Sequence, residues 1–209
     1  LRAADGWPGN DLDKGLCELA PSSIEASRRR YWNEVQRHLQ PQGRLVDKYP
    51  LTMTRLPYVA RLFPKADWIL LLRHPCDCVL SCYMQAFGSN GGAKAFASLE
   101  STARTYVAIM EWWHEQRAYS PARVHTLRYE DLVGDVGEEL AGLMDFLSLS
   151  VEQQQFSFDN LAASRSRRIN TPSYSQVVQP LNAGAVGRWR SYRAHFSDEI
   201  LAMLAPWVT

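Results

Sequence analysis

The feature that most constrains the fold is an apolar run, Trp68–Leu72, which is followed at once by Arg73, His74 and Pro75. Five consecutive apolar residues are typical of a strand that is buried on both faces of a sheet. Proline is favoured in the first turn of a helix, because its missing N–H group would have no partner there. The sequence therefore predicts a strand that ends near Arg73 and a helix that runs from Pro75 to about Phe87.

Other strands and helices alternate with this pair along the chain. Short strands are predicted over residues 44–47 and 123–129. Ser22 and Glu25 have the spacing of a capping box at the start of a helix. Helices are predicted over residues 22–39, 54–63, 93–119 and 135–147, and after Ser197. This alternation predicts an α/β protein with a parallel sheet flanked by helices, in which ligands bind beyond the carboxyl ends of the strands.

Composition places the chain among ordinary globular proteins. It has 209 residues, of which 46% are hydrophobic and 22% charged, so we expect a single domain over residues 1–209. The net charge of +1 gives no strong field for a nucleic acid. The apolar runs are too short to span a membrane, and no signal peptide is visible. We therefore expect no nucleic-acid partner, no membrane span and a cytoplasmic location.

The charge is unevenly distributed along the second half of the chain. Eight acidic residues and no Lys or Arg lie between Tyr129 and Asn160, whereas six arginines and no acidic residue lie between Asn160 and Ser197. A concentrated positive charge suits an anionic ligand. The alternative is that two solvated faces of opposite charge attract each other.

Three polar groups stand where the predicted strands end. The planar guanidinium of Arg73 can donate two hydrogen bonds to phosphate oxygens. The first-turn N–H groups of the next helix and the Ser81 hydroxyl could add further donors. Lys48 follows the strand at 44–47, and Tyr129 ends the strand at 123–129. The alternatives are an arginine that only pairs with a carboxylate, a surface lysine, and a segment after Tyr129 whose carboxylates, Glu130 and Asp131, only cap the next turn. Together these residues predict an anion site at one edge of the sheet.

A metal site competes with this interpretation. His74, Cys76, Cys78 and Cys82 are four soft ligands within nine residues. Zinc sites usually take pairs of ligands two to four residues apart in a loop, and a helix that begins at Pro75 would point Cys76 away from Cys78 and Cys82. We therefore expect no metal at these residues.

Six segments in this order resemble the sulfotransferase family. They are most similar to bacterial sulfotransferases that carry tetratricopeptide repeats and to protein-tyrosine sulfotransferases, and the resemblance spans residues 44–207. Tetratricopeptide repeats upstream in a parent chain are one expectation from it. The segments are Val46–Pro50, Leu62–Ala66, Leu72–Ser81, Arg128–Val133, Thr171–Val177 and Pro180–Tyr192.

The resemblance implies a P-loop-like α/β fold and a reaction. The family transfers a sulfonate group from 3′-phosphoadenosine 5′-phosphosulfate to a hydroxyl or amine acceptor, without a metal. The acceptor cannot be read from this sequence. The implied roles are catalysis for Lys48 and Ser173, 3′-phosphate binding for Arg73 and Ser81, and cofactor contacts for Tyr129 and Arg188.

One departure from the family pattern bears on activity. The family has a Gly/Ser/Thr-rich loop after its first strand that cradles the 5′-phosphosulfate, and the Gly-rich stretch Gly88–Gly92 follows a predicted helix instead. We therefore expect the C-terminal two thirds of a sulfotransferase domain, without its first strand and loop, that is inactive by itself. The alternatives are a non-catalytic domain of the same fold that binds an anionic nucleotide or a partner, and a P-loop kinase relative, for which no Walker lysine loop is visible.

Overall fold

The computed structural model describes residues 19–85, 93–157, 181 and 183–208. Two compact units divide the chain, Leu1–Ala66 with Glu111–Arg123 and Asp67–Met110 with Val124–Thr209. Ser173 and the segment Thr171–Val177 lie outside the described residues. The expectation of a single domain stays a prediction. Over the described residues, no helix has both the length and the apolar character that crossing a membrane requires.

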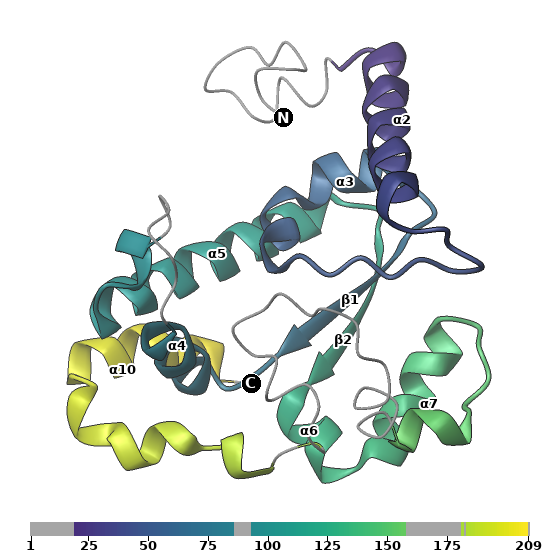
Figure 1. Cartoon of the computed structure of the whole chain (residues 1–209). Helices are drawn as coiled ribbons and strands as arrows, with labels where there is room; N and C mark the ends of the chain where they lie inside the picture. Colours follow the sequence, from purple (N-terminus) through teal and green to yellow (C-terminus); the bar gives the residue numbers. More distant parts are fainter. Residues whose placement is uncertain (1–18, 86–92, 158–180, 182, 209) are drawn as a thin grey trace. The chain divides into compact units, whose positions relative to one another are not determined.

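The first unit is built from helices (Figure 1). Its aromatic contacts join Tyr31 and Trp32 to Phe63, with ring centroids 4.9 and 6.3 Å apart. The Trp112 indole N–H donates to the Thr54 carbonyl at 2.9 Å, and Leu56 is fully buried. The elements of this unit are α2 (Pro21–His38), η1 (Pro50–Arg55), α3 (Leu56–Leu62) and the C-terminal part of α5 (Leu99–Tyr119).

The second unit contains the sheet. Strands β1 (Asp67–Leu72) and β2 (Arg123–Arg128) are hydrogen-bonded neighbours, and Figure 1 shows that they run in the same direction. Parallel strands need a long crossover, and α4 (Pro75–Met84), η2 (Ala93–Phe96) and α5 lie in the connection. The elements after β2 are α6 (Tyr129–Gly134), α7 (Val136–Phe146), η3 (Gln153–Ser157), η4 (Ala183–Ala185), η5 (Arg188–His195), α10 (Asp198–Leu204) and η6 (Ala205–Trp207).

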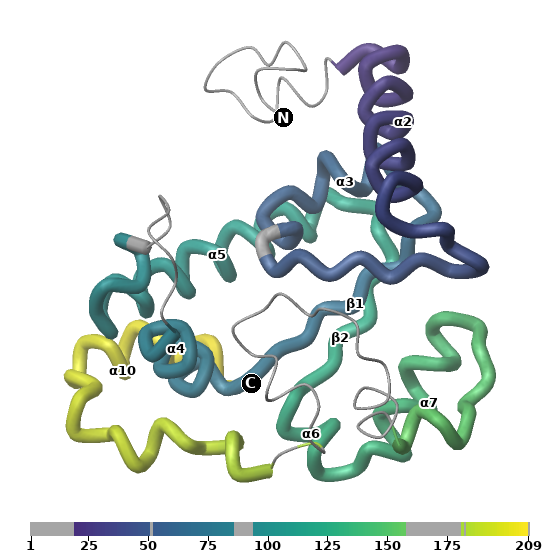
Figure 2. Tube along the Cα trace, in the orientation of Figure 1, coloured from purple at the N-terminus to yellow at the C-terminus, as the bar shows by residue number. Residues whose placement is uncertain are grey.

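The core of the second unit lies between α4, α5 and the C-terminal segment. Figure 2 shows the C-terminal segment, in yellow, running beside α4. Phe196 and Leu204 are at most 2% exposed, and the Phe196 ring packs edge-on against Trp189 at 5.9 Å. The buried members of this core cluster are Cys76, Val79, Leu80, Ala103, Phe196, Ile200 and Leu204. The residues that follow β1 are thereby held in place by a segment more than 100 residues later in the sequence.

Several sequence predictions are confirmed. The α/β class with a parallel sheet, the strand after Asp67 and the helix that starts at Pro75 are all present. The Ser197 hydroxyl accepts the Ile200 N–H and caps α10, and the Asp135 carboxylate caps α7 in the same way.

Other predictions are wrong. Residues 44–47 form no strand, because the segment lies outside the sheet and a strand needs a hydrogen-bonding neighbour. Ile69 and Leu71 are 44% and 57% exposed, so β1 is not buried on both faces. Ser22 does not cap α2, which starts one residue earlier with Ala20 at its N-cap.

Candidate functional site

The carboxyl ends of the two strands bring Arg73 and Tyr129 together. Arg73 follows the last residue of β1, and Tyr129 follows the last residue of β2 and opens α6. The Arg73 guanidinium carbon lies 5.3 Å from the centre of the Tyr129 ring, a favourable position for a cation against the face of an aromatic ring. Two residues that the sequence proposed separately therefore form one site in the second unit.

The Arg73 side chain is held in place and retains a free donor. Its Nη2 donates to the Ala185 carbonyl and lies 3.9 Å from Asp77 Oδ1. Its Nε is buried and has no hydrogen-bond partner among the described residues. Because a buried N–H group normally has a partner, an oxygen atom of a ligand at this position would satisfy it. The site therefore suits an anion that Arg73 binds.

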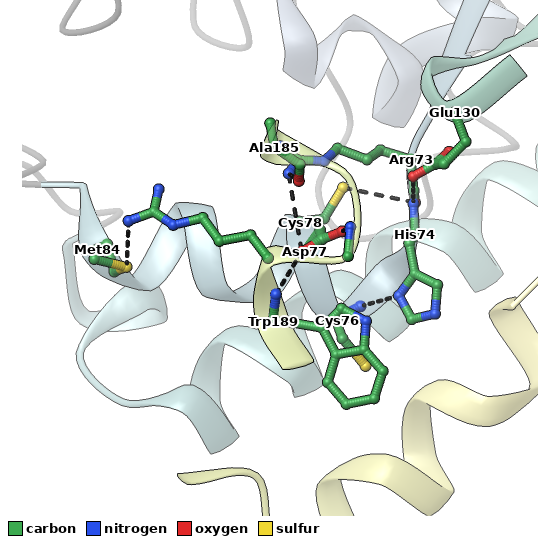
Figure 3. Close-up of polar contacts among 11 residues, drawn as sticks. Arg73, His74, Cys76, Asp77, Cys78, Met84, Glu130, Ala185 and Trp189 are labelled. Carbon is green, nitrogen blue, oxygen red and sulfur yellow. Dashed lines mark hydrogen bonds and ion pairs between the residues drawn. The ribbon is translucent and has the colours of Figure 1, made fainter. Parts of the chain in front are cut away.

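The N-terminal turn of α4 does not offer free N–H groups (Figure 3). The Cys76 N–H donates to His74 Nδ1 at 3.3 Å, and the Asp77 and Cys78 N–H groups donate to the His74 carbonyl. The His74 N–H donates to the Glu130 carboxylate at 2.9 Å. These N–H groups therefore already have partners in the structure, and the expectation that they bind an anion stays a prediction, as does anion binding by the Arg73 side chain.

Glu130 and Asp77 are two carboxylates whose roles the sequence analysis missed. Glu130 Oε2 is buried 3.9 Å from Arg128 Nη2. Asp77 is 1% exposed, and its carboxylate accepts the N–H groups of Gly187 and Trp189 at 2.7 and 2.8 Å. Both carboxylates join segments that are far apart in the sequence. The available signal for Asp77 was its position four residues after Arg73, whose Nη2 lies 3.9 Å from Asp77 Oδ1.

Burial lowers the pKa of His74 below 6.5, outweighing the nearby carboxylates of Asp77 and Glu130. The neutral ring can therefore accept the Cys76 N–H, and it stacks on Trp189 with ring centroids 5.3 Å apart. The unfolded chain takes up this proton near pH 6.5 and the folded chain only at lower pH. The free energy of unfolding contributed by His74 will therefore fall as the pH drops below about 6.5.

Urea unfolding between pH 7 and pH 5 tests this pH dependence. His74→Asn keeps an acceptor for the Cys76 N–H but has no titrating ring, so we expect its stability to fall less steeply with decreasing pH than that of the wild type. His195→Asn, which replaces an exposed histidine, should keep the wild-type slope. Equal slopes for His74→Asn and the wild type would contradict the assignment.

Ser81 lies further along α4, and Arg188, the first residue of η5, contacts the end of that helix. Arg188 is exposed, its Nη2 lies 3.8 Å from Met84 Sδ, and its guanidinium lies 5.9 Å from the centre of the Tyr192 ring. Ser81 is partly buried one turn after Asp77. The Arg188 guanidinium thus contacts the C-terminal end of α4, whereas Arg73 precedes its N-terminal end.

Lys48 belongs to the first unit. It is exposed in a segment without regular structure. The preceding residue, Asp47, accepts the Tyr31 hydroxyl at 2.9 Å, which fixes this segment to α2. Burial and then the Asp47 carboxylate raise the pKa of Tyr31 to about 12, so the hydroxyl remains a donor at neutral pH.

The described cysteines, Cys76, Cys78 and Cys82, are free thiols near His74. Burial raises the pKa of Cys76 to about 11 and that of Cys78 to about 12, which disfavours the thiolates that bind zinc. The Cys78 thiol faces the Arg73 carbonyl, with sulfur and oxygen 3.8 Å apart. Within the described part of the chain, no three His, Cys, Asp or Glu side chains converge as metal ligands would.

Comparison with known proteins identifies the family. The model of a sulfotransferase family matches residues 14–153, which is more than half of the chain. The chain belongs to the sulfotransferase family. This family match includes Lys48, Arg73, Ser81 and Tyr129 and ends before Arg188.

Individual relatives agree with this family. A putative protein-tyrosine sulfotransferase of Caenorhabditis elegans is 26% identical over 178 residues, which cover 81% of this chain and 64% of the relative. The omega-hydroxy-beta-dihydromenaquinone-9 sulfotransferase Stf3 of Mycobacterium tuberculosis is 27% identical over 141 residues, which cover 64% of this chain and 36% of Stf3. The chain thus spans between about a third and two thirds of the length of such curated relatives.

A solved structure shows the same fold. The sulfotransferase domain from the curacin biosynthetic pathway superposes with a TM-score of 0.56 at 16% sequence identity, covering 99% of this chain and 76% of that domain. This likeness supports the predicted sulfotransferase fold for the described elements.

Proposed function

We propose that this chain binds 3′-phosphoadenosine 5′-phosphosulfate and contributes to the transfer of its sulfonate group to an acceptor. The observation that carries the proposal is the Arg73 guanidinium, which lies at the carboxyl end of β1 beside Tyr129 with a buried, unpaired Nε. Family membership supplies the reaction class, and the arginine supplies a suitable contact for a phosphate group.

The site residues have distinct roles in this proposal. Arg73 and Ser81 bind the 3′-phosphate, Tyr129 lines the nucleotide pocket, and Arg188 supplies positive charge toward the phosphates. Lys48 stabilises the negative charge that develops when the bond between sulfur and the leaving phosphate oxygen breaks. The family resemblance assigns Ser173 a role near that bridging oxygen.

The names of two relatives support a hydroxyl acceptor rather than an amine. One relative is named for protein tyrosine and the other for an omega-hydroxy lipid, and both names point to a hydroxyl. We therefore propose a hydroxyl acceptor for this chain.

The 209 residues alone should bind the nucleotide without efficient turnover. No Gly/Ser/Thr-rich stretch follows a predicted strand in this sequence, so we expect it to lack the contacts that would hold the 5′-phosphosulfate in line for transfer. Isothermal titration with 3′-phosphoadenosine 5′-phosphosulfate should show saturable binding. A transfer assay with labelled donor and hydroxyl acceptors should show little product.

Either part of this proposal can be overturned. A folded chain that gives no saturable binding would contradict the nucleotide site. Turnover comparable to that of a full-length relative would contradict the expected inactivity.

Binding without turnover would also fit a non-catalytic domain, and the absence of the loop is the observation that favours this second function. The two are distinguished by restoring a Gly/Ser/Thr-rich loop and first strand from a relative, which should restore turnover only if Lys48 and Arg73 are catalytically competent.

A further inference from the structure

The Asp77 carboxylate joins the start of α4 to the segment Gly187–Trp189 (Figure 3). Its two oxygens accept one backbone N–H group each, from Gly187 at 2.7 Å and from Trp189 at 2.8 Å. The side chain has no exposed surface, and its donors lie 110 and 112 residues later in the sequence. Short bonds from N–H groups to a buried carboxylate are stronger than bonds between neutral groups.

The backbone of the joined segment is shaped for this contact. Gly187 has a φ of 67° and a ψ of 14°, a left-handed conformation that disfavours residues with a Cβ atom. A Cβ atom at this position would lie 2.7 Å from Arg190 Nη1, so the flexible Arg190 side chain would also have to move. The turn thus depends on glycine, and it directs two N–H groups toward one carboxylate.

The joined segment carries groups that the proposed nucleotide site uses. Arg188 lies between the two anchored residues, and the Trp189 ring stacks on His74, next to Arg73. The carbonyl of Ala185, just before this segment, accepts a hydrogen bond from Arg73 Nη2. Fixing the segment therefore fixes the neighbours of the Arg73 guanidinium as well as the backbone of Arg188.

We propose that Asp77 is a positioning residue that holds Gly187–Trp189 against the start of α4 and so sustains nucleotide affinity. This inference rests on the proposed function. The inference can be distinguished from a purely electrostatic effect of Asp77. Removing a negative charge beside Arg73 would by itself strengthen the binding of an anion. If Asp77 acts by positioning, its neutralisation weakens binding instead.

Asp77→Asn is the direct test. The Asn side chain can accept one of the two N–H groups with its oxygen, but its NH₂ group would face the other as donor against donor. We expect hydrogen exchange at the Gly187 and Trp189 amides to become at least about tenfold faster, and the affinity for adenosine 3′,5′-bisphosphate to fall about tenfold.

A second test variant, Gly187→Ala, and two control variants, Gly134→Ala and Val79→Ala, distinguish loss of the Asp77 contact from a general folding defect. Gly187→Ala disturbs the same contact from the opposite side and should reproduce both effects, whereas Gly134→Ala should reproduce neither, because nothing lies within 4 Å of its added Cβ atom. Val79→Ala removes buried volume from the same helix and should lower stability without changing either measurement.

The outcomes separate this inference from the proposed function. A wild-type chain that does not bind adenosine 3′,5′-bisphosphate would defeat the proposed function, while amide exchange would still report on the Asp77 contact. Unchanged exchange in Asp77→Asn would overturn the inference. Equal or tighter nucleotide binding by Asp77→Asn, when the wild type binds, would overturn it as well.

Discussion

Replacing Arg73 with alanine will remove most of the stabilisation that adenosine 3′,5′-bisphosphate gives to the folded chain. Hydrogen bonds to a charged group are worth about 1.5–3 kcal/mol, so the loss of this side chain should weaken binding roughly 10- to 100-fold. Arg73→Lys keeps the charge but cannot offer the planar fork, and it should recover only part of the affinity. Titration calorimetry of each variant measures the effect directly.

The matched control for this prediction is Arg104→Ala. Arg104 lies on α5, its side chain is 67% exposed, and it pairs with Glu100 one turn away. Its removal should leave nucleotide affinity unchanged, because surface pairs of this kind contribute little. If Arg73→Ala and Arg104→Ala bind the nucleotide equally well, the proposed anion site is in the wrong place.

Replacing Phe196 with alanine will have the largest effect on stability. The side chain is 2% exposed, and it packs against Trp189 and the core cluster of α4, α5 and α10. Removing a buried Phe side chain costs about 3–5 kcal/mol, a large part of the stability of an ordinary domain. The midpoint of thermal unfolding should fall by about 6–20 °C.

Phe156→Ala is the control for this loss. Phe156 lies in η3 and is 43% exposed, so the same substitution should cost well under half as much. Chemical denaturation of both variants compares the two free energies of unfolding. A Phe196→Ala chain that is as stable as the wild type would show that the C-terminal segment does not pack on α4 as described.

The parts of the fold that could be predicted from sequence depend on local signals. The apolar residues of β1, the Pro75 start of α4 and the Ser197 cap of α10 are each determined by a few neighbouring residues. The prediction of a strand at 44–47 was wrong, because strand formation depends on a neighbouring strand elsewhere in the chain.

The candidate site was predicted less completely for the same reason. Arg73 and Tyr129 could be found because residues at the carboxyl ends of parallel strands meet at one edge of the sheet. The Glu130 contact with the His74 N–H, which occupies the expected anion position, joins residues 56 apart in sequence. The Asp77 contacts join residues more than 100 apart. No local pattern encodes such pairings.

The central claim is that the carboxyl end of β1 binds a 3′-phosphate, and a thermal melt of the 209-residue chain tests it most directly. Adenosine 3′,5′-bisphosphate at 100 times its dissociation constant should stabilise the fold by about 2.7 kcal/mol, which raises the melting temperature by about 5–10 °C. Adenosine 5′-monophosphate, which lacks the 3′-phosphate, should give little change. A cooperative melt that responds equally to both nucleotides, or to neither, would contradict the claim.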